Sequence, residues 1–266
     1  MKIDRSAWLL VGGSGVLKLI FAMFTAVGED ERAILAQTLE FVKNRMPAFH
    51  GARVVYTDTV LPGMMQDLLF GIPALLSGGS VLATVLFGAL MNWAAWILIW
   101  MMYVRLFPKL SPVAIAATIF LAPWTYVYTG FINPAYMLPA SALCYWAMFH
   151  LGEVSTASWK NARLWALIAA SWVFAFQFNL SFVLLVLICG CAVAFKSLPW
   201  LSKKSWIGLF GGGSIASLTL LPGALIKPTA STPLHASGLF EVVAKNIHFD
   251  PVHVQDLYKI AFRFLT

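Results

Sequence analysis

Acidic residues follow the first apolar stretch of the chain closely enough to act together. Glu29, Asp30 and Glu31 are consecutive, and Asp67 lies in a second, mostly apolar stretch at 62–76. Carboxylates this close repel one another, so the pKa of at least one is expected to be raised, which favours a general base that works near neutral pH. The structural alternative is that three acids begin a helix, where its positive dipole end favours negative charge.

The elements that carry these residues need lipid, because the chain is far more apolar than a soluble domain. Hydrophobic residues make up 60% of the 266 residues and charged residues 11%, against roughly 45–50% and 25% in average soluble proteins. The apolar residues form stretches near the roughly 20 residues that cross a bilayer as a helix. The composition therefore predicts an all-α polytopic membrane protein.

About seven membrane-spanning helices are predicted. The stretch 164–195 is too long for one span, since a helix of its length would extend for about 48 Å. Gln177, Asn179 and Ser181 interrupt it at its centre, so we predict a short hairpin that keeps these side chains near an interface or inside protein. The other five predicted spans are 6–27, which we interpret as a retained signal anchor, 80–104, 112–129, 137–151 and 207–226.

Basic residues predict the orientation of these spans. With the N-terminus inside, nine of the 18 lysines and arginines fall in the short inner segments 1–5, 105–110, 152–163 and 196–206. Only eight fall in the outer segments 28–78, 130–136 and 227–266, which together are about three times longer. This distribution agrees with the positive-inside rule. The same orientation puts nine of the 11 acids outside, so chemistry is expected on the outer face.

Two interfacial helices are predicted in the first outer loop, 28–78. Apolar residues recur near helical spacing between Ala33 and Val42, with charged residues among them, which predicts an amphipathic helix on the outer membrane face. The stretch 62–76 is too short to span and too apolar for a free loop, so it is the second candidate. For Asp67, which it carries, a side chain that faces water is the plainer interpretation.

The order of these features resembles the GT-C superfamily of membrane glycosyltransferases, particularly its bacterial ArnT/RgtA-like branch. A basic residue, Lys18, lies in the first span, the pair Asp30 and Glu31 lies just outside it, and two interfacial helices precede closely spaced spans. The stretch 124–136 is similar to that family's short outer turn between the third and fourth spans. Unlike the family's acidic motif, this one has no aromatic residue shortly after it, at 32–35.

The resemblance implies transfer of a sugar from a polyprenyl-phosphate donor to a lipid or glycan acceptor on the outer face. A carboxylate would deprotonate the acceptor, and a cation would stabilise the departing phosphate. Asp30 is the best candidate for the base, with Glu31 beside it, and Asp67 is a second acid that orients the acceptor or assists a metal. The phosphate candidates are Arg53, which can form two parallel bonds to phosphate oxygens, and then Lys227 or Lys245. No cofactor is predicted, and a divalent metal is left open.

The spans predict a single transmembrane domain over 1–266, with an outer C-terminal segment at 227–266. The expected location is the bacterial inner membrane, with a cytoplasmic N-terminus. Because members of the family have more than seven spans, the chain is expected to be truncated at its C-terminus. The expected partners are the polyprenyl-phosphate donor, the acceptor and membrane lipids.

Two other functions stay open at this stage. A transporter or flippase of a lipid or small solute would use a helix break such as 177–181 near the bilayer midplane, although the two halves of the chain show no repeat. A non-catalytic assembly subunit would fit the modest length. Nucleic acid is not an expected partner despite the net charge of +7, because the cations flank the predicted spans. His248 and His253 lie near two aspartates, but a solvated loop is a plainer interpretation than a metal site.

Overall fold

The computed structural model describes residues 4–24, 29–47, 50–53, 60–127, 133–179, 182–195, 198 and 201–221, all within the unit Met1–Lys227. In a few of these stretches only the backbone is described, namely at 29–31, 50, 52–53, 60–62, 124, 127 and 133–136. The predicted site residues Lys227 and Lys245 lie outside the described residues, as do the histidines at 248 and 253.

Helices dominate the described chain, which confirms the predicted helical class. They are α1 (Arg5–Phe24), α2 (Glu29–Asn44), the π-helical η1 (Asp67–Gly71), α3 (Ile72–Leu76), α4 (Val81–Leu106), α5 (Pro112–Phe120), α6 (Trp124–Val127), α7 (Asn133–Leu151), α8 (Trp159–Phe178), α9 (Phe182–Ala194) and α10 (Lys203–Ser217). The described residues also contain an antiparallel pair of strands that was not predicted from the sequence, β1 (His50–Arg53) and β2 (Val60–Pro62). In this pair His50 lies opposite Pro62 and Arg53 opposite Val60.

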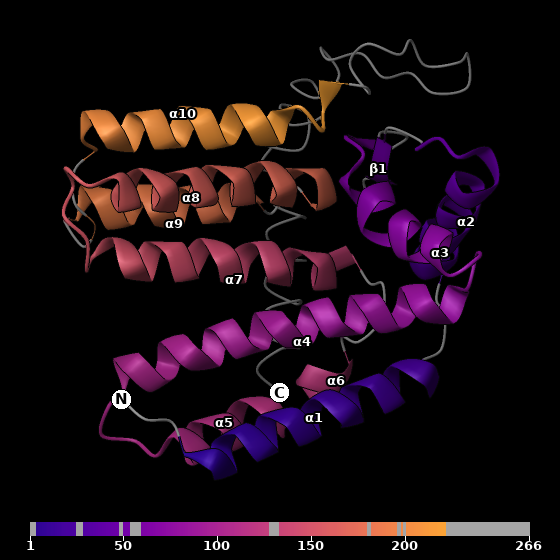
Figure 1. Cartoon of the computed structure of the whole chain (residues 1–266), viewed down its shortest axis with the longest axis horizontal. Helices are drawn as coiled ribbons and strands as arrows, with labels where there is room; N and C mark the ends of the chain where they lie inside the picture. Colours follow the sequence, from indigo (N-terminus) through magenta and orange to yellow (C-terminus); the bar gives the residue numbers. More distant parts are fainter. Residues whose placement is uncertain are drawn as a thin grey trace, which may run out of the picture. The chain divides into compact units, whose positions relative to one another are not determined.

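The long helices pack in a chain of neighbours (Figure 1). Helix α10 packs on α8, α8 on α7, α7 on α4, and α4 on α1, which also contacts α5. Helix α9 contacts both α7 and α8. The first loop adds a group of short elements, in which α2, η1 and α3 pack on one another and the β1–β2 pair contacts α8. Figure 1 shows this group beyond one end of α7, α8 and α10, where α3 and η1 contact α4.

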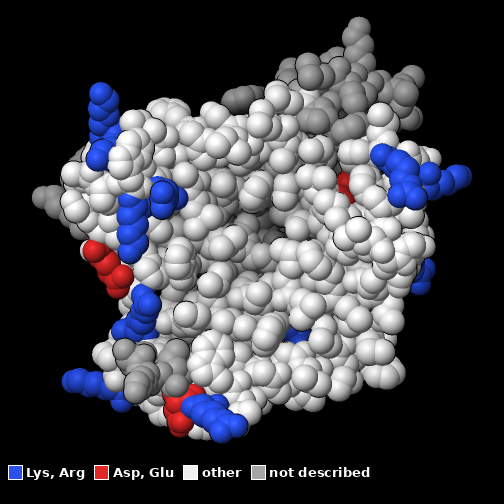
Figure 2. Space-filling model, in the orientation of Figure 1, with Lys and Arg blue, Asp and Glu red and all other residues white. Residues whose placement is uncertain are grey.

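Two of the described helices, α1 and α4, are long and apolar enough to cross a membrane. Their most apolar windows are only 33% and 22% buried, whereas the core helix of a soluble protein would be mostly buried. Large apolar side chains point outward, among them Leu9 at 66% exposure and Phe24 at 82%. Figure 2 shows blue cations mainly toward the two ends of the visible face, with a largely uncharged band between them. These features indicate membrane association.

The predicted segments fall on helices, with one correction. The stretch 164–195 contains two packed helices, α8 and α9, which separate after Phe178 as the hairpin predicts. The stretch 112–129 was predicted as one helix but forms the short α5 and α6. Pro123 explains the interruption, because proline has no N–H to donate and disfavours helical backbone in the residue before it.

Small residues bring α8 and α10 into close contact. A Cβ atom added to Gly212 would lie 2.5 Å from Ala166 Cα, and one added to Gly208 would lie 2.8 Å from Ala162 Cα. Within the glycine triplet 211–213, by contrast, a Cβ on Gly211 would meet nothing within 4 Å. The contact therefore uses Gly208 and Gly212, a small-xxx-small spacing on one helix face.

The second predicted interfacial helix begins later than expected. Residues predicted as helix from 62 instead end strand β2 at Pro62, and helical structure over Asp67–Leu76 follows a turn. Gly63 makes that turn at a φ of 113°, which L side chains rarely adopt. The Gln177 side chain fills the space where a Cβ on Gly63 would lie. Backbone conformation and close packing both therefore require glycine here.

Candidate functional site

Helix α2 is amphipathic, and its apolar face packs on the π-helical element η1. Ile34 and Leu35 form a buried cluster with Phe70 of η1 and Phe178 of α8. About two turns further along α2, Phe41 packs against Gly71. Leu39, which the sequence pattern placed among the recurring apolar residues, is 44% exposed and lies outside this buried face. The first loop is thus folded onto the long helices through α2 and η1.

A polar network is buried within this contact. Gln37 Nε2 donates to Asp67 Oδ1 at 2.9 Å, and Gln66 Nε2 donates to Gln37 Oε1 at 3.2 Å. Gln66 and Asp67 are both almost fully buried. Gln66 Oε1 accepts no hydrogen bond from the part of the chain that the structure describes. A buried acceptor without a donor is costly, so the Gln66 amide is only partly satisfied within the network.

Asp67 does not face water, so the plainer interpretation from sequence is wrong. Its exposure is 1%, and it begins the π-helical turn Asp67–Gly71. Pro73 is in the first turn of α3 and has no N–H for an α-helical bond to the Leu69 carbonyl, which accounts for the irregular turn before it. Such π-helical turns occur frequently at functional sites.

Gln177 joins the first loop to the ends of α8 and α10. Its Oε1 accepts a hydrogen bond from the Met65 backbone N–H at 3.2 Å, and its Nε2 donates to Thr219 Oγ1 at 2.7 Å. The Met64 N–H donates to the Thr219 carbonyl at 3.2 Å, which completes the connection. Gln177 is fully buried, as predicted for the polar residues at the hairpin turn.

The other predicted site residues are described only by their backbones. Asp30 and Glu31 lie in the first turn of α2, which begins five residues after α1 ends at Phe24. Arg53 ends strand β1. The structure therefore places all three in the same loop group as Asp67, and it describes no contact of their side chains. Lys227 and Lys245 remain predictions.

Sequence reasoning missed Gln37 and Gln66 as members of the site. The signal was present, because each is an uncharged polar residue within an otherwise apolar pattern: Gln37 lies three residues after Ile34 and four before Phe41. Such positions face a buried surface, where an amide needs a partner. Periodicity does not identify that partner, which lies 30 residues away in Asp67.

An apolar cavity of about 180 Å³ lies beside the network. Its walls come from η1, α4, α7 and α8, and they include Phe70 of η1, Leu143 of α7 and Phe178 of α8. Phe70 and Phe178 also belong to the cluster that holds α2. Phe70 and Phe178 therefore line the cavity and also hold α2, the helix that carries Gln37 of the polar network.

Lys18 forms a second buried polar feature, at the break between α5 and α6. Its Nζ donates to the Thr125 carbonyl, and its exposure is 1%. Side chains satisfy the carbonyls around the break: Thr125 Oγ1 donates to the Ile119 carbonyl at 2.7 Å, and the Tyr126 hydroxyl to the Phe120 carbonyl at 2.6 Å. Among the described residues, the ammonium therefore meets a backbone carbonyl instead of an acid.

The described residues contain no group of three or more His, Cys, Asp or Glu side chains placed to hold a metal ion. Comparisons of the chain with models of known protein families, with characterised proteins and with solved structures found no match. The function is therefore argued from the residues and contacts described above.

Proposed function

We propose that the chain is a multi-pass membrane protein with about seven spans and a cytoplasmic N-terminus, in a bacterial inner membrane. Helices α8 and α9 would form the short hairpin, and the broken α5–α6 would count as one span. The positive-inside distribution of lysine and arginine supports this orientation. The group formed by α2, η1 and the strand pair would then lie on the outer face.

We further propose that this outer group transfers a sugar from a polyprenyl-phosphate donor to a lipid or glycan acceptor. The observation that carries the proposal is the buried Asp67–Gln37–Gln66 network, which holds α2 against η1. Helix α2, which this network holds in place, begins with Glu29, Asp30 and Glu31 only a few residues after α1 ends. Carboxylates would thus be fixed near the depth of the lipid headgroups, where the phosphate of a lipid-linked donor lies.

The burial of Asp67 supports different roles for the candidate acids. We assign Asp30 as the general base, with Glu31 beside it, and Arg53 as the first candidate to meet the departing phosphate. Asp67 is assigned a positioning role, because it is almost fully buried and accepts a hydrogen bond from Gln37.

Transfer from a radiolabelled polyprenyl-phosphate sugar by membranes that contain the full chain tests these roles. A general base contributes about 10²–10⁴-fold to rate, so Asp30→Asn should lower transfer by at least about a hundredfold, whereas the exposed Glu40→Gln on the same helix should not. Asp67→Asn keeps an oxygen for Gln37 and should retain most activity, while Asp67→Leu should lose it. Equal activity of Asp30→Asn and wild type would remove Asp30 from the base role.

The break between α5 and α6 favours one competing function, a transporter or flippase. Transporters bind substrates near the bilayer midplane at discontinuous helices, and a buried cation at such a break is a common functional feature. Lys18 and the Thr125 carbonyl provide that arrangement. Lys18→Met distinguishes the two functions: loss of solute or lipid transport in proteoliposomes would favour the transporter, whereas sugar transfer that persists in this variant would favour the transferase.

A further inference from the structure

A wide apolar groove lies between α4, α5 and α7, away from the outer group. Its volume is about 890 Å³, and its walls include Trp96, Met102 and Phe107 on the α4 side, Ile119 of α5, and Tyr145 and Phe149 of α7. Several of its residues are half exposed, including Tyr103, whose ring stacks on that of Phe107 with centroids 5.8 Å apart. The groove is therefore open along its side and lined almost entirely by apolar groups.

The length of the groove matches one leaflet of a bilayer. The lining residues of α4 run from Trp96 to its C-cap residue Phe107. At 1.5 Å per residue this is about 16 Å, or about half of the roughly 30 Å hydrocarbon core. Phe107 lies at the end of α4 that the proposed topology places at the cytoplasmic surface. The groove thus runs from that surface to about the bilayer midplane.

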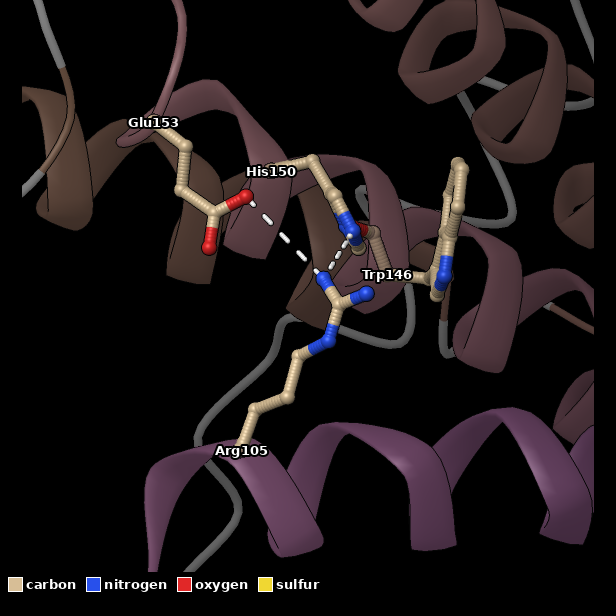
Figure 3. Close-up of polar contacts among 4 residues, drawn as sticks. All are labelled: Arg105, Trp146, His150 and Glu153. Atoms are coloured by element: carbon tan, nitrogen blue, oxygen red, sulfur yellow. Dashed lines mark hydrogen bonds and ion pairs between the residues drawn. The ribbon is translucent and has the colours of Figure 1, made fainter. Parts of the chain in front are cut away.

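Arg105 lies on α4 between the groove-lining residues Tyr103 and Leu106, and its side chain reaches α7 (Figure 3). Arg105 Nη1 and His150 Nε2 are 2.8 Å apart, and the other ring nitrogen of His150 is 2.9 Å from the Trp146 carbonyl. A carbonyl can only accept, so His150 Nδ1 carries the proton and Nε2 accepts from Arg105. His150 also packs on Trp146 and Phe149, with ring centroids 4.3 Å and 5.4 Å away. Helix α7 therefore fixes the position of the Arg105 guanidinium.

The guanidinium keeps donors for a further ligand. Its contacts within the described residues, to His150 and to the half-exposed Glu153 at 4.0 Å, both use Nη1. The Nε and Nη2 groups remain, which is the edge that arginine uses for two parallel bonds to phosphate. The segment 105–110 also carries Lys109 and no acid. An anion is therefore complementary to this end of the groove.

We propose that the groove binds an anionic phospholipid of the cytoplasmic leaflet, with an acyl chain along α4 and the phosphate at Arg105. The proposal rests on the membrane topology given above but not on sugar transfer. Lipid binding is measured without any sugar donor, so its failure would leave the transferase proposal untouched. Conversely, outer-loop variants that lose sugar transfer should still bind lipid at Arg105.

Native mass spectrometry of the full chain in detergent, titrated with phosphatidylglycerol or with phosphatidylcholine of the same acyl chains, tests this site. We expect wild type to bind phosphatidylglycerol more tightly, and Arg105→Gln to weaken that binding about tenfold, or about 1.4 kcal/mol. Lys203→Gln, which removes an exposed cation from the predicted inner segment 196–206, is the matched control and should have no effect. Arg105→Lys, which keeps the charge but not the two parallel bonds, should give an intermediate affinity.

A second variant tests the groove without touching the arginine. Thr118 is an exposed groove residue of α5, so Thr118→Trp would occupy the groove and should weaken phosphatidylglycerol binding. Equal affinity of wild type for the two lipids, equal losses in Arg105→Gln and Lys203→Gln, or unchanged binding in Thr118→Trp would each overturn the proposal. A second copy of the chain bound in place of lipid would also overturn it.

Discussion

The contact between α8 and α10 predicts opposite effects for two neighbouring glycine-to-alanine substitutions. In Gly212→Ala the new Cβ would lie 2.5 Å from Ala166 Cα, whereas carbon atoms in contact lie about 3.5–4.0 Å apart. The two helices must therefore separate by about 1 Å, and overpacking of this kind typically costs about 1–3 kcal/mol. In Gly211→Ala the Cβ meets nothing within 4 Å.

Helix propensity affects both variants equally. The difference between their free energies of unfolding therefore reports the packing contact alone. Alanine is favoured over glycine in a helix by about 0.5–1 kcal/mol, which should stabilise Gly211→Ala. Gly212→Ala should have a free energy of unfolding about 1–3 kcal/mol below that of Gly211→Ala. The assay is unfolding in mixed micelles of increasing denaturing detergent, followed by circular dichroism. Equal stability of the two variants, or a more stable Gly212→Ala, would refute the packing described for α8 and α10.

Two further predictions concern the first loop and its orientation. Gln177→Leu leaves the partly buried Met65 N–H and Thr219 hydroxyl without this partner, so the free energy of unfolding should fall by about 1–3 kcal/mol in the same detergent assay. An impermeant maleimide should label Lys43→Cys in intact cells, and Lys109→Cys only after the membrane is permeabilised, both in a cysteine-free background. Unchanged stability of Gln177→Leu would contradict the first prediction. Labelling of both cysteines in intact cells would contradict the second.

Apolar patterning was sufficient to locate most of the helices. A stretch such as 164–195 exceeds the length of one span, and its central polar residues indicate where it turns, which the end of α8 at Phe178 bears out. The same patterning joined α5 and α6 into one segment, because residues 119–124 are all apolar. The break comes from the missing backbone N–H of proline, which a pattern of side-chain hydropathy does not reveal.

The candidate site was predictable only in part, because its contacts join residues far apart in sequence. Asp67 stood out as an acid in an apolar stretch, but its burial depends on Gln37 from another helix. Gly63 could be recognised as a turn residue from its type, whereas its need for glycine comes from the Gln177 side chain packed against it. The strand pair that carries Arg53 has no alternating apolar pattern, so the sequence gives no sign of it.

We propose that the outer face of this chain transfers sugar with Asp30 as base. Transfer from a labelled, short-chain polyprenyl-phosphate sugar is measured with right-side-out spheroplasts and with inverted vesicles, each containing wild type or Asp30→Asn at matched expression. We predict transfer by wild type when the donor is supplied from the outer side, and its loss in Asp30→Asn. Transfer confined to inverted vesicles, equal transfer by the two proteins, or none by wild type would contradict the claim.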